Sequence, residues 1–332
     1  MLTFQDILPE DGGYFQFMRE TVEPYLCSYR KEGFFSSKDE KKLYYECEIL
    51  PSAKGAVVIS HGYNESAEKF REMAYWFMQM GFSVFTLDHR GHGRSHRLSP
   101  DLALTDIESF SDYVRDLHCF VKKIVQPNTV GLPLYLYGHS MGGAVSILYL
   151  QNHPSVFRKA ILTAPMLKPK TEGIPTPVTR AMSAVCRVFG KGDKLVFTAK
   201  AGFNDNEQFE SSPDTSKERF EYYRQKRVAY PYLQNSYPTY RWVNESLRIG
   251  KYMLDPIRVA RVKIPVLLFS AGEDDFVFRR EQEIFISLLE NGELYYEDRA
   301  RHEIYMSTND VMADYLSEIE TFLKRATQKK QK

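Results

Sequence analysis

The sequence of 332 residues is poor in cysteine. It has only Cys27, Cys47, Cys119 and Cys186, and none of them forms a Cys-x-x-Cys pair. This spacing indicates neither a disulfide framework nor a cysteine-based zinc site. Scattered thiols are typical of proteins from a reducing compartment, so we expect a cytoplasmic location.

The sequence also lacks an apolar run long enough to span a bilayer. Its first residues, MLTFQDILPEDGG, do not combine a basic start with an apolar stretch, so we expect no signal peptide. The net charge is only +1, which indicates no general attraction to nucleic acid or anionic membrane. We expect the short basic tail, residues 326–332, to be solvated and to make at most transient contact with a membrane surface.

Apolar segments of strand length recur along the chain, and several are apolar throughout, as in parallel strands covered on both faces. In residues 106–125, apolar side chains recur at three- and four-residue spacing, which predicts an amphipathic helix. This alternation predicts an α/β fold, with a mostly parallel central sheet and helices on both faces. The predicted strands are residues 56–61, 82–88, 132–138, 159–165, 264–270 and 293–298.

The alternation stops near Leu167 and resumes near Ile264. We therefore predict a core formed by residues 1–167 and 259–325, and a helical lid inserted at residues 168–258. Such an insertion would cover the carboxyl edge of the sheet, where ligands bind in open α/β sheets. Its aromatic residues alternate with arginines, as on some nucleic-acid-binding surfaces. Without net positive charge or a recognised motif, we interpret them as packing of the lid and expect no nucleic-acid partner.

The segment LYLYGHSMGGAVSILYL, residues 134–150, places a Gly-x-Ser-x-Gly motif between a predicted strand and a predicted helix. Gly138 and Gly142 allow the backbones of the strand and the helix to approach closely. Ser140 lies at the apex, which is the position of the nucleophile in a nucleophile elbow. The alternative is a plain glycine-rich turn, but the strand before it and the helix after it favour a nucleophile.

A serine hydroxyl becomes a good nucleophile only when a base accepts its proton. The base is usually a histidine held by a carboxylate, and with this elbow the chain order is serine, acid, histidine. Of the eight histidines, only His153 and His302 follow Ser140. His153 comes at the end of the helix that leaves the elbow, before any strand that could carry the acid. We therefore predict His302 as the base.

The triad acid should lie at the end of the strand that precedes His302. The segment IPVLLFSAGEDDFV offers Glu273, Asp274 and Asp275. Asp298 is too near His302 along the chain to serve. The composition of the segment does not choose between Asp274 and Asp275.

Attack on an acyl carbon creates an oxyanion, which backbone N–H groups stabilise by about 3 kcal/mol each. We predict one donor at Met141, directly after the nucleophile. We predict the other at Tyr63, in the loop SHGYNES after the first clear strand.

The segment DHRGHGRSH, residues 88–96, contains three histidines that could bind zinc. Their spacing follows no usual zinc pattern, and the two glycines instead predict a tight loop at the end of a strand. The segment also lacks the third glycine of a dinucleotide fingerprint. We expect neither a metal nor a cofactor.

The motifs HGYNES, DHRGHGRS, GHSMGG and ARHEIYMS together resemble the lysophospholipase and monoacylglycerol lipase family of α/β-hydrolases, which is often grouped with serine aminopeptidases. In the predicted lid, TSKERFEYYR and YPTYRWVNES are similar to bacterial lysophospholipase L2-type sequences. The resemblance extends over about residues 35–323. It implies an α/β-hydrolase fold and a Ser-Asp-His triad without metal or cofactor.

The resemblance also bears on individual residues. The acid motif of the family, Ala-Gly-x-Asp-x-x-Val, matches residues 271–277 and favours Asp274, whereas a related Gly-x-x-Asp pattern selects Asp275. After the first His-Gly the family often has a small residue, where this chain has Tyr63. The large side chain implies a narrower acyl pocket.

These observations predict a serine hydrolase that cleaves carboxylic esters of lipid monoesters, either lysophospholipids or monoacylglycerols. Ser140 would be the nucleophile, His302 the general base and acid, and Asp274 the orienting carboxylate. The expected partner is thus a lipid or ester substrate. The sequence does not indicate the oligomeric state.

Three alternatives share the predicted fold. A carboxylesterase for small or aryl esters would need the same triad. A non-catalytic binding module usually lacks a triad member, and none is missing here. A serine aminopeptidase would need a lid carboxylate to hold the ammonium group of its substrate. The available lid carboxylates are Glu207, Glu210, Glu218 and Glu245.

Overall fold

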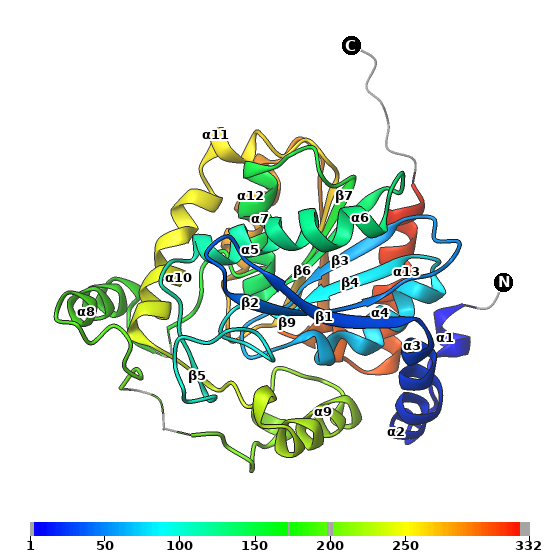
Figure 1. The fold of residues 1–332 in the computed structure, drawn as a ribbon, viewed down its shortest axis with the longest axis horizontal. Coiled ribbons are helices and arrows are strands. Elements are labelled where there is room, and N and C mark those ends of the chain that lie inside the picture. Colours follow the sequence, from blue (N-terminus) through cyan, green and yellow to red (C-terminus); the bar gives the residue numbers. More distant parts are fainter. Residues whose placement is uncertain (1–2, 172, 198, 200–201, 326–332) are drawn as a thin grey trace.

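The computed structural model describes residues 3–171, 173–197, 199 and 202–325 (Figure 1). The predicted basic tail, residues 326–332, lies outside the described residues. Within them, the main sheet has eight strands in the order β1–β2–β4–β3–β6–β7–β9–β10. These strands are β1 (Arg30–Ser36), β2 (Lys42–Glu48), β3 (Ala56–Ser60), β4 (Ser83–Leu87), β6 (Leu134–His139), β7 (Lys159–Thr163), β9 (Val266–Glu273) and β10 (Gly292–Arg301).

The pairing of the strands confirms the predicted α/β class. From β4 to β10 all neighbouring strands are parallel, whereas β1 and β2 add an antiparallel edge. The six predicted strands correspond to β3, β4, β6, β7, β9 and β10. The sequence pattern did not predict β2, because this strand buries the charged side chains of Glu46 and Glu48. Ion pairs with Arg71 and Arg30 offset the loss of their hydration.

Helices cover both faces of the sheet, as predicted (Figure 1). Successive residues of a strand point to opposite faces, so Val58 belongs to one apolar cluster and Val57 and Ile59 to the other. On the first face lie α5 (Ser111–Phe120), α7 (Ser140–Asn152) and α12 (Arg279–Leu288). On the second face lie α3 (Glu23–Tyr29), α4 (Arg71–Gln79) and α13 (Asn309–Lys324). Three further short helices are α1 (Phe4–Ile7), α2 (Tyr14–Phe17) and α6 (Gln126–Asn128).

The helix predicted for residues 106–125 begins later, at Ser111, and continues beyond α5 as a π-helical turn to Val125. Asp106 is not helical because its carboxylate accepts hydrogen bonds from Thr239 and Arg241, which lie far along the chain. Among the described residues, no helix combines the length and the apolar character needed to cross a bilayer.

The chain between β7 and β9 leaves the sheet and forms a largely helical insertion. It contains α8 (Thr176–Val188), α9 (Lys217–Ala229), β8 (Tyr237–Pro238), α10 (Tyr240–Met253) and α11 (Pro256–Val259). Strand β8 pairs with β5 (Leu104–Thr105) in a separate two-stranded sheet. Helix α8 packs against α10 and projects from one side of the molecule, while α9 lies apart from it along another edge (Figure 1).

The segment before Phe35, whose role the sequence pattern does not predict, packs against α9. The ring of Tyr14 makes an edge contact with Tyr222, with 5.7 Å between ring centroids. Arg219 and Glu72, both buried, form an ion pair of 2.7 Å, and the hydroxyl of Tyr14 donates to the same carboxylate. These contacts attach α9 to both the N-terminal segment and α4.

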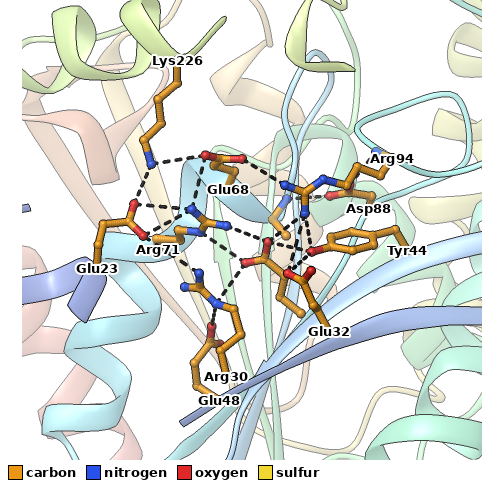
Figure 2. A network of polar contacts seen from close by, with 12 residues as sticks. Glu23, Arg30, Glu32, Tyr44, Glu48, Glu68, Arg71, Asp88, Arg94 and Lys226 are labelled. Carbon is orange, nitrogen blue, oxygen red and sulfur yellow. Dashed lines mark hydrogen bonds and ion pairs between the residues drawn. The ribbon is translucent and has the colours of Figure 1, made fainter. Parts of the chain in front are cut away.

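A second group of ion pairs holds the other end of α9. Figure 2 shows Lys226 between Glu23 of α3 and Glu68, at 2.5 Å and 3.3 Å from their carboxylate oxygens. Arg71 contacts the same two carboxylates from the core. Because several opposite charges share these contacts, the network holds α9, α3 and α4 together.

We predict that Arg219→Met destabilises the protein by about 3–5 kcal/mol, because it leaves the carboxylate of Glu72 buried without its cation. The measurement is the free energy of unfolding in urea. Arg280→Met, which replaces an exposed arginine of α12, is the control and should change this free energy by less than about 0.5 kcal/mol. Equal effects of the two substitutions would contradict the role of the buried pair.

Candidate active site

The turn between β6 and α7 is tight and strained, as expected for a nucleophile elbow. Ser140 has a φ of 48°, in the left-handed region that non-glycine residues rarely occupy. A Cβ atom on Gly142 would lie 2.0 Å from the carbonyl oxygen of Ser60, and one on Gly138 would lie 2.4 Å from Oγ of Ser146. Glycine at both positions therefore permits the close approach of β6, α7 and the end of β3.

The structure brings three predicted site residues into one hydrogen-bonded series. Oγ of Ser140 lies 2.8 Å from Nε2 of His302, and Nδ1 of His302 lies 2.7 Å from Oδ2 of Asp274. His302 directly follows β10, and Asp274 directly follows β9, so the ends of two neighbouring strands position them. This is the geometry in which an imidazole can accept a proton from the serine while a carboxylate holds its other nitrogen.

The structure distinguishes the two candidate carboxylates. The other oxygen of Asp274 accepts hydrogen bonds from the backbone N–H groups of Phe276 and Val277, at 2.8 Å and 3.0 Å. Burial acts to raise the pKa of Asp274, but His302 and these donors outweigh it and hold the pKa below its usual value. Asp275 is exposed to solvent. Of these two carboxylates, Asp274 is therefore the one that contacts the imidazole of His302.

The predicted oxyanion donors flank Ser140. Met141 is the second residue of α7, so its N–H group belongs to the first turn, which has no acceptor within the helix. Tyr63 lines the same cavity as Ser140, in the loop after β3. The carboxylate of Glu65 accepts a hydrogen bond from the backbone N–H of Gly62 and so holds this loop. That these two N–H groups bind an oxyanion stays a prediction.

Ser140 and His302 open into a cavity of about 700 Å³ between the sheet edge and the insertion. Its walls differ in chemistry. Met182 of α8 and Trp242, Val243 and Leu247 of α10 form an apolar part. The part next to α9 is rich in charged groups. A ligand with one apolar and one polar end fits this division.

A buried charged cluster behind the triad was not predicted. Nζ of Lys69 lies 2.5 Å from Glu303 and 3.7 Å from Glu65, and the hydroxyl of Tyr305 donates to Glu65. Burial raises the pKa of Asp214, which shares a hydrogen bond with Glu303, well above its usual value. The position of Glu303 directly after His302 was the available signal in the sequence. The cluster connects the loop of Tyr63 to the segment that carries His302.

Two groups of residues could be considered as metal ligands. Glu65, His139 and Glu303 offer ligand atoms within 4.8 Å of one another. The ammonium group of Lys69 already supplies a positive charge to both glutamates, so these residues do not require a metal ion for charge balance.

Two of the three histidines of residues 88–96 have other partners. His89 contacts the hydroxyl of Ser60, and His92 contacts the carbonyl of Arg90. Burial lowers the pKa of both histidines well below the usual value, so they are neutral packing residues. Within the part of the chain that the structure describes, their ring nitrogens do not form a group close enough to share a metal.

Of the four lid carboxylates considered for an ammonium group, only Glu207 lines the cavity, and it is paired with Arg227 at 2.7 Å. Glu218 instead accepts a hydrogen bond from the backbone of Gly12. Glu245 is buried between arginines, and Glu210 is exposed to solvent.

The sequence matches the profile of the family described as "Serine aminopeptidase, S33" over residues 51–309. It is 32% identical over 283 residues to "Lysophospholipase L2" of Escherichia coli (strain K12), covering 81% of this chain and 80% of that protein. It is 33% identical over 129 residues to "Monoglyceride lipase" of Homo sapiens, covering 37% of this chain and 39% of that protein.

Solved structures show the same fold. A variant of monoglyceride lipase from Saccharomyces cerevisiae, in complex with a substrate analog, has a TM-score of 0.69 at 20% identity and covers 89% of this chain and 95% of that one. A thermostable carboxyl esterase from Bacillus coagulans has a TM-score of 0.71 at 17% identity, with coverage of 89% and 97%. The predicted α/β-hydrolase fold is confirmed.

We predict that Asp274→Asn slows covalent labelling of Ser140 by a fluorophosphonate probe about ten-thousand-fold, because the amide cannot hold the required imidazole tautomer. The measurement is the labelling rate at neutral pH. Asp275→Asn, the adjacent and exposed change, is the matched control and should label almost as fast as the unaltered protein. A larger loss of labelling rate in Asp275→Asn than in Asp274→Asn would show that Asp275, and not Asp274, orients the imidazole.

Proposed function

The chain belongs to the serine aminopeptidase S33 family, and we propose that it is a serine hydrolase that cleaves carboxylic esters of lipid monoesters, lysophospholipids or monoacylglycerols. The observation that carries this proposal is the series Ser140–His302–Asp274 opening into a cavity with apolar and charged walls. The names of the relatives, a lysophospholipase and a monoglyceride lipase, support the lipid monoester as the substrate class.

In the proposed mechanism, Oγ of Ser140 attacks the ester carbonyl carbon while Nε2 of His302 accepts its proton. Asp274 stabilises the imidazolium that results. The backbone N–H groups of Tyr63 and Met141 stabilise the tetrahedral oxyanion. His302 then gives the proton to the leaving alcohol, and an acyl group stays on Ser140. Water, activated by the same imidazole, releases the fatty acid and restores the serine.

We assign residues 168–258 the role of a lid over this site. In support of that role, α8, α9 and α10 all contribute side chains to the cavity. The ring of Tyr63 packs against that of Trp242 with 4.4 Å between centroids, at the apolar part of the cavity. This contact supports the narrower acyl pocket that the large residue at position 63 implies.

The proposed chemistry leaves two related activities as outcomes of the test. A small-ester carboxylesterase would use the same triad. An aminopeptidase is less favoured, because it needs a lid carboxylate that can hold the ammonium group of its substrate. Of the four candidates, only Glu207 lines the cavity, and it is already paired with Arg227. The cytoplasmic location and the absence of a nucleic-acid partner stay predictions from the sequence.

We predict that Ser140→Ala lowers ester turnover by on the order of a million-fold, because members of a triad act as a unit. The assay uses a monoacylglycerol, a lysophosphatidylcholine, a short aryl ester and an aminoacyl anilide. The unaltered protein should prefer the two lipids.

The control is Ser287→Ala, which removes a serine hydroxyl from the exposed side of α12 and should leave turnover unchanged. Circular dichroism checks that both variants fold. Substantial ester turnover by Ser140→Ala would refute the assigned nucleophile. Cleavage of the anilide without the esters would instead identify an aminopeptidase.

A further inference from the structure

Helix α9 has two faces with different partners, and one of them is fixed to the core. Arg219, Tyr222 and Lys226 recur at helical spacing on this first face. Arg219 pairs with Glu72. Figure 2 shows the second pair, Lys226 with Glu23. The ion pairs and the aromatic contacts of Tyr222 hold the helix in place from behind.

The second face of α9 lines the cavity. Phe220, Tyr223, Arg224 and Arg227 recur at three- and four-residue spacing, and all four border the cavity that contains Ser140. Because the first face is fixed, the two guanidinium groups of the second face are held at one side of the cavity. They therefore reach the cavity from a rigid support, as a specific subsite requires.

The apolar wall lies on other elements. It comes from α8 and α10, where Met182, Trp242 and Leu247 border the same cavity. In the proposed reaction, the acyl chain of the substrate lies along this wall, because burial of methylene groups there is favourable. The polar head group then faces α9.

We propose that Arg224 and Arg227 form a subsite for the phosphate of a lysophospholipid head group, an inference that rests on the proposed function. The planar guanidinium group presents paired donors that match phosphate oxygens, and it stays charged at all working pH values. The uncharged glycerol of a monoacylglycerol would gain no such contact. The subsite thus favours lysophospholipids over monoacylglycerols.

In the structure, carboxylates occupy some of these donors, and Arg227 also donates to the backbone carbonyls of Leu233 and Asn235. Arg224 pairs with Glu221 at 2.7 Å, and Arg227 pairs with Glu207 at 2.7 Å. The side chains of Glu221 and Glu207 are 34% and 31% exposed. Such partly exposed ion pairs are weak, so a phosphate can replace either carboxylate. Arg224 also donates to the backbone carbonyl of Asp205, which keeps its side chain directed along the same wall.

Charged side chains of both signs line the cavity. Burial raises the pKa of Asp214 well above its usual value and that of Glu65 to about 8, so burial opposes a negative charge on both carboxyl groups. The charged side chains that remain along the cavity are the cations Lys69, Lys170, Arg224 and Arg227 and the anions Glu207 and Glu303. Arg224 and Arg227 are the cations that α9 contributes to this lining.

The experiment compares a lysophosphatidylcholine with a monoacylglycerol of the same acyl chain. In Arg224→Gln, the ratio of kcat/KM for the phospholipid to that for the monoacylglycerol should fall about tenfold, mainly through KM, because one charge-assisted hydrogen-bonding group is lost. Arg227→Gln should lower the ratio in the same direction. The matched control is Arg180→Gln, an exposed arginine of α8 outside the cavity, which should leave the ratio unchanged.

The measured quantity is the ratio of the kcat/KM values for two substrates. A variant that folds poorly lowers both values and therefore does not produce the expected fall in the ratio. An unchanged ratio in Arg224→Gln overturns the subsite. So does an unaltered protein that cleaves the monoacylglycerol but not the phospholipid, and in that case the proposed function stands. An unaltered protein that cleaves neither lipid refutes the proposed function and this inference with it.

A second experiment distinguishes recognition of a lipid head group from binding of a free phosphate ion. Glycerophosphocholine and inorganic phosphate are each added as inhibitors of monoacylglycerol cleavage. Stronger inhibition by glycerophosphocholine, weakened in Arg224→Gln, supports a head-group subsite. Equal inhibition by the two compounds identifies a site for any phosphate and overturns the assignment to a lipid.

Discussion

The left-handed turn at Ser140 is the constraint on which the geometry of the site depends. A non-glycine residue in this conformation is strained by about 1–3 kcal/mol, and packing around it must hold it there. That packing comes from β6 and α7, whose backbones touch the end of β3 where only Gly142 fits. As a result the serine hydroxyl, the start of α7 and the loop of Tyr63 meet at one sheet edge. His302 reaches the same point because parallel strands end together.

Buried charges connect this rigid centre to the insertion that lines the cavity. Behind the triad, Lys69 bridges Glu65 of the loop that follows β3 and Glu303 of the segment that follows β10. At the other side of the insertion, Arg219 and Lys226 tie α9 to the core and to the N-terminal segment. Removing one partner of a buried pair is costly, so such pairs hold elements in defined positions even where their net contribution to stability is small. The apolar side chains of α10 and the charged side chains of the anchored α9 thus form two chemically different walls of the cavity.

Much of the fold could be predicted because its signals are local. Strands β3, β4 and β7 are buried along their whole length, and β6 and β9 along most of theirs, so their apolar composition alone indicates parallel strands covered on both faces. The elbow is equally local, since strand, glycines, serine and helix lie within residues 134–150. Chain order then identifies His302 without any distance being known. In contrast, the sequence pattern did not predict β2, because Glu46 and Glu48 of this strand pair with arginines that are remote in the sequence. It did not predict the N-terminal helices either, because they pack against α9.

The sequence by itself determined the α/β class, the nucleophile candidate and the histidine, because each depends on residue type, periodicity or chain order. Only the tertiary structure decided between Asp274 and Asp275, since adjacent side chains point in different directions and only one meets the imidazole. The same holds for Lys69, Asp214 and Glu303, whose cluster is assembled from three distant segments. The two faces of α9 also became distinct only when its partners were in place. Long-range ion pairs such as Arg219–Glu72 join residues 147 positions apart, and no local pattern in the chain records such a pairing.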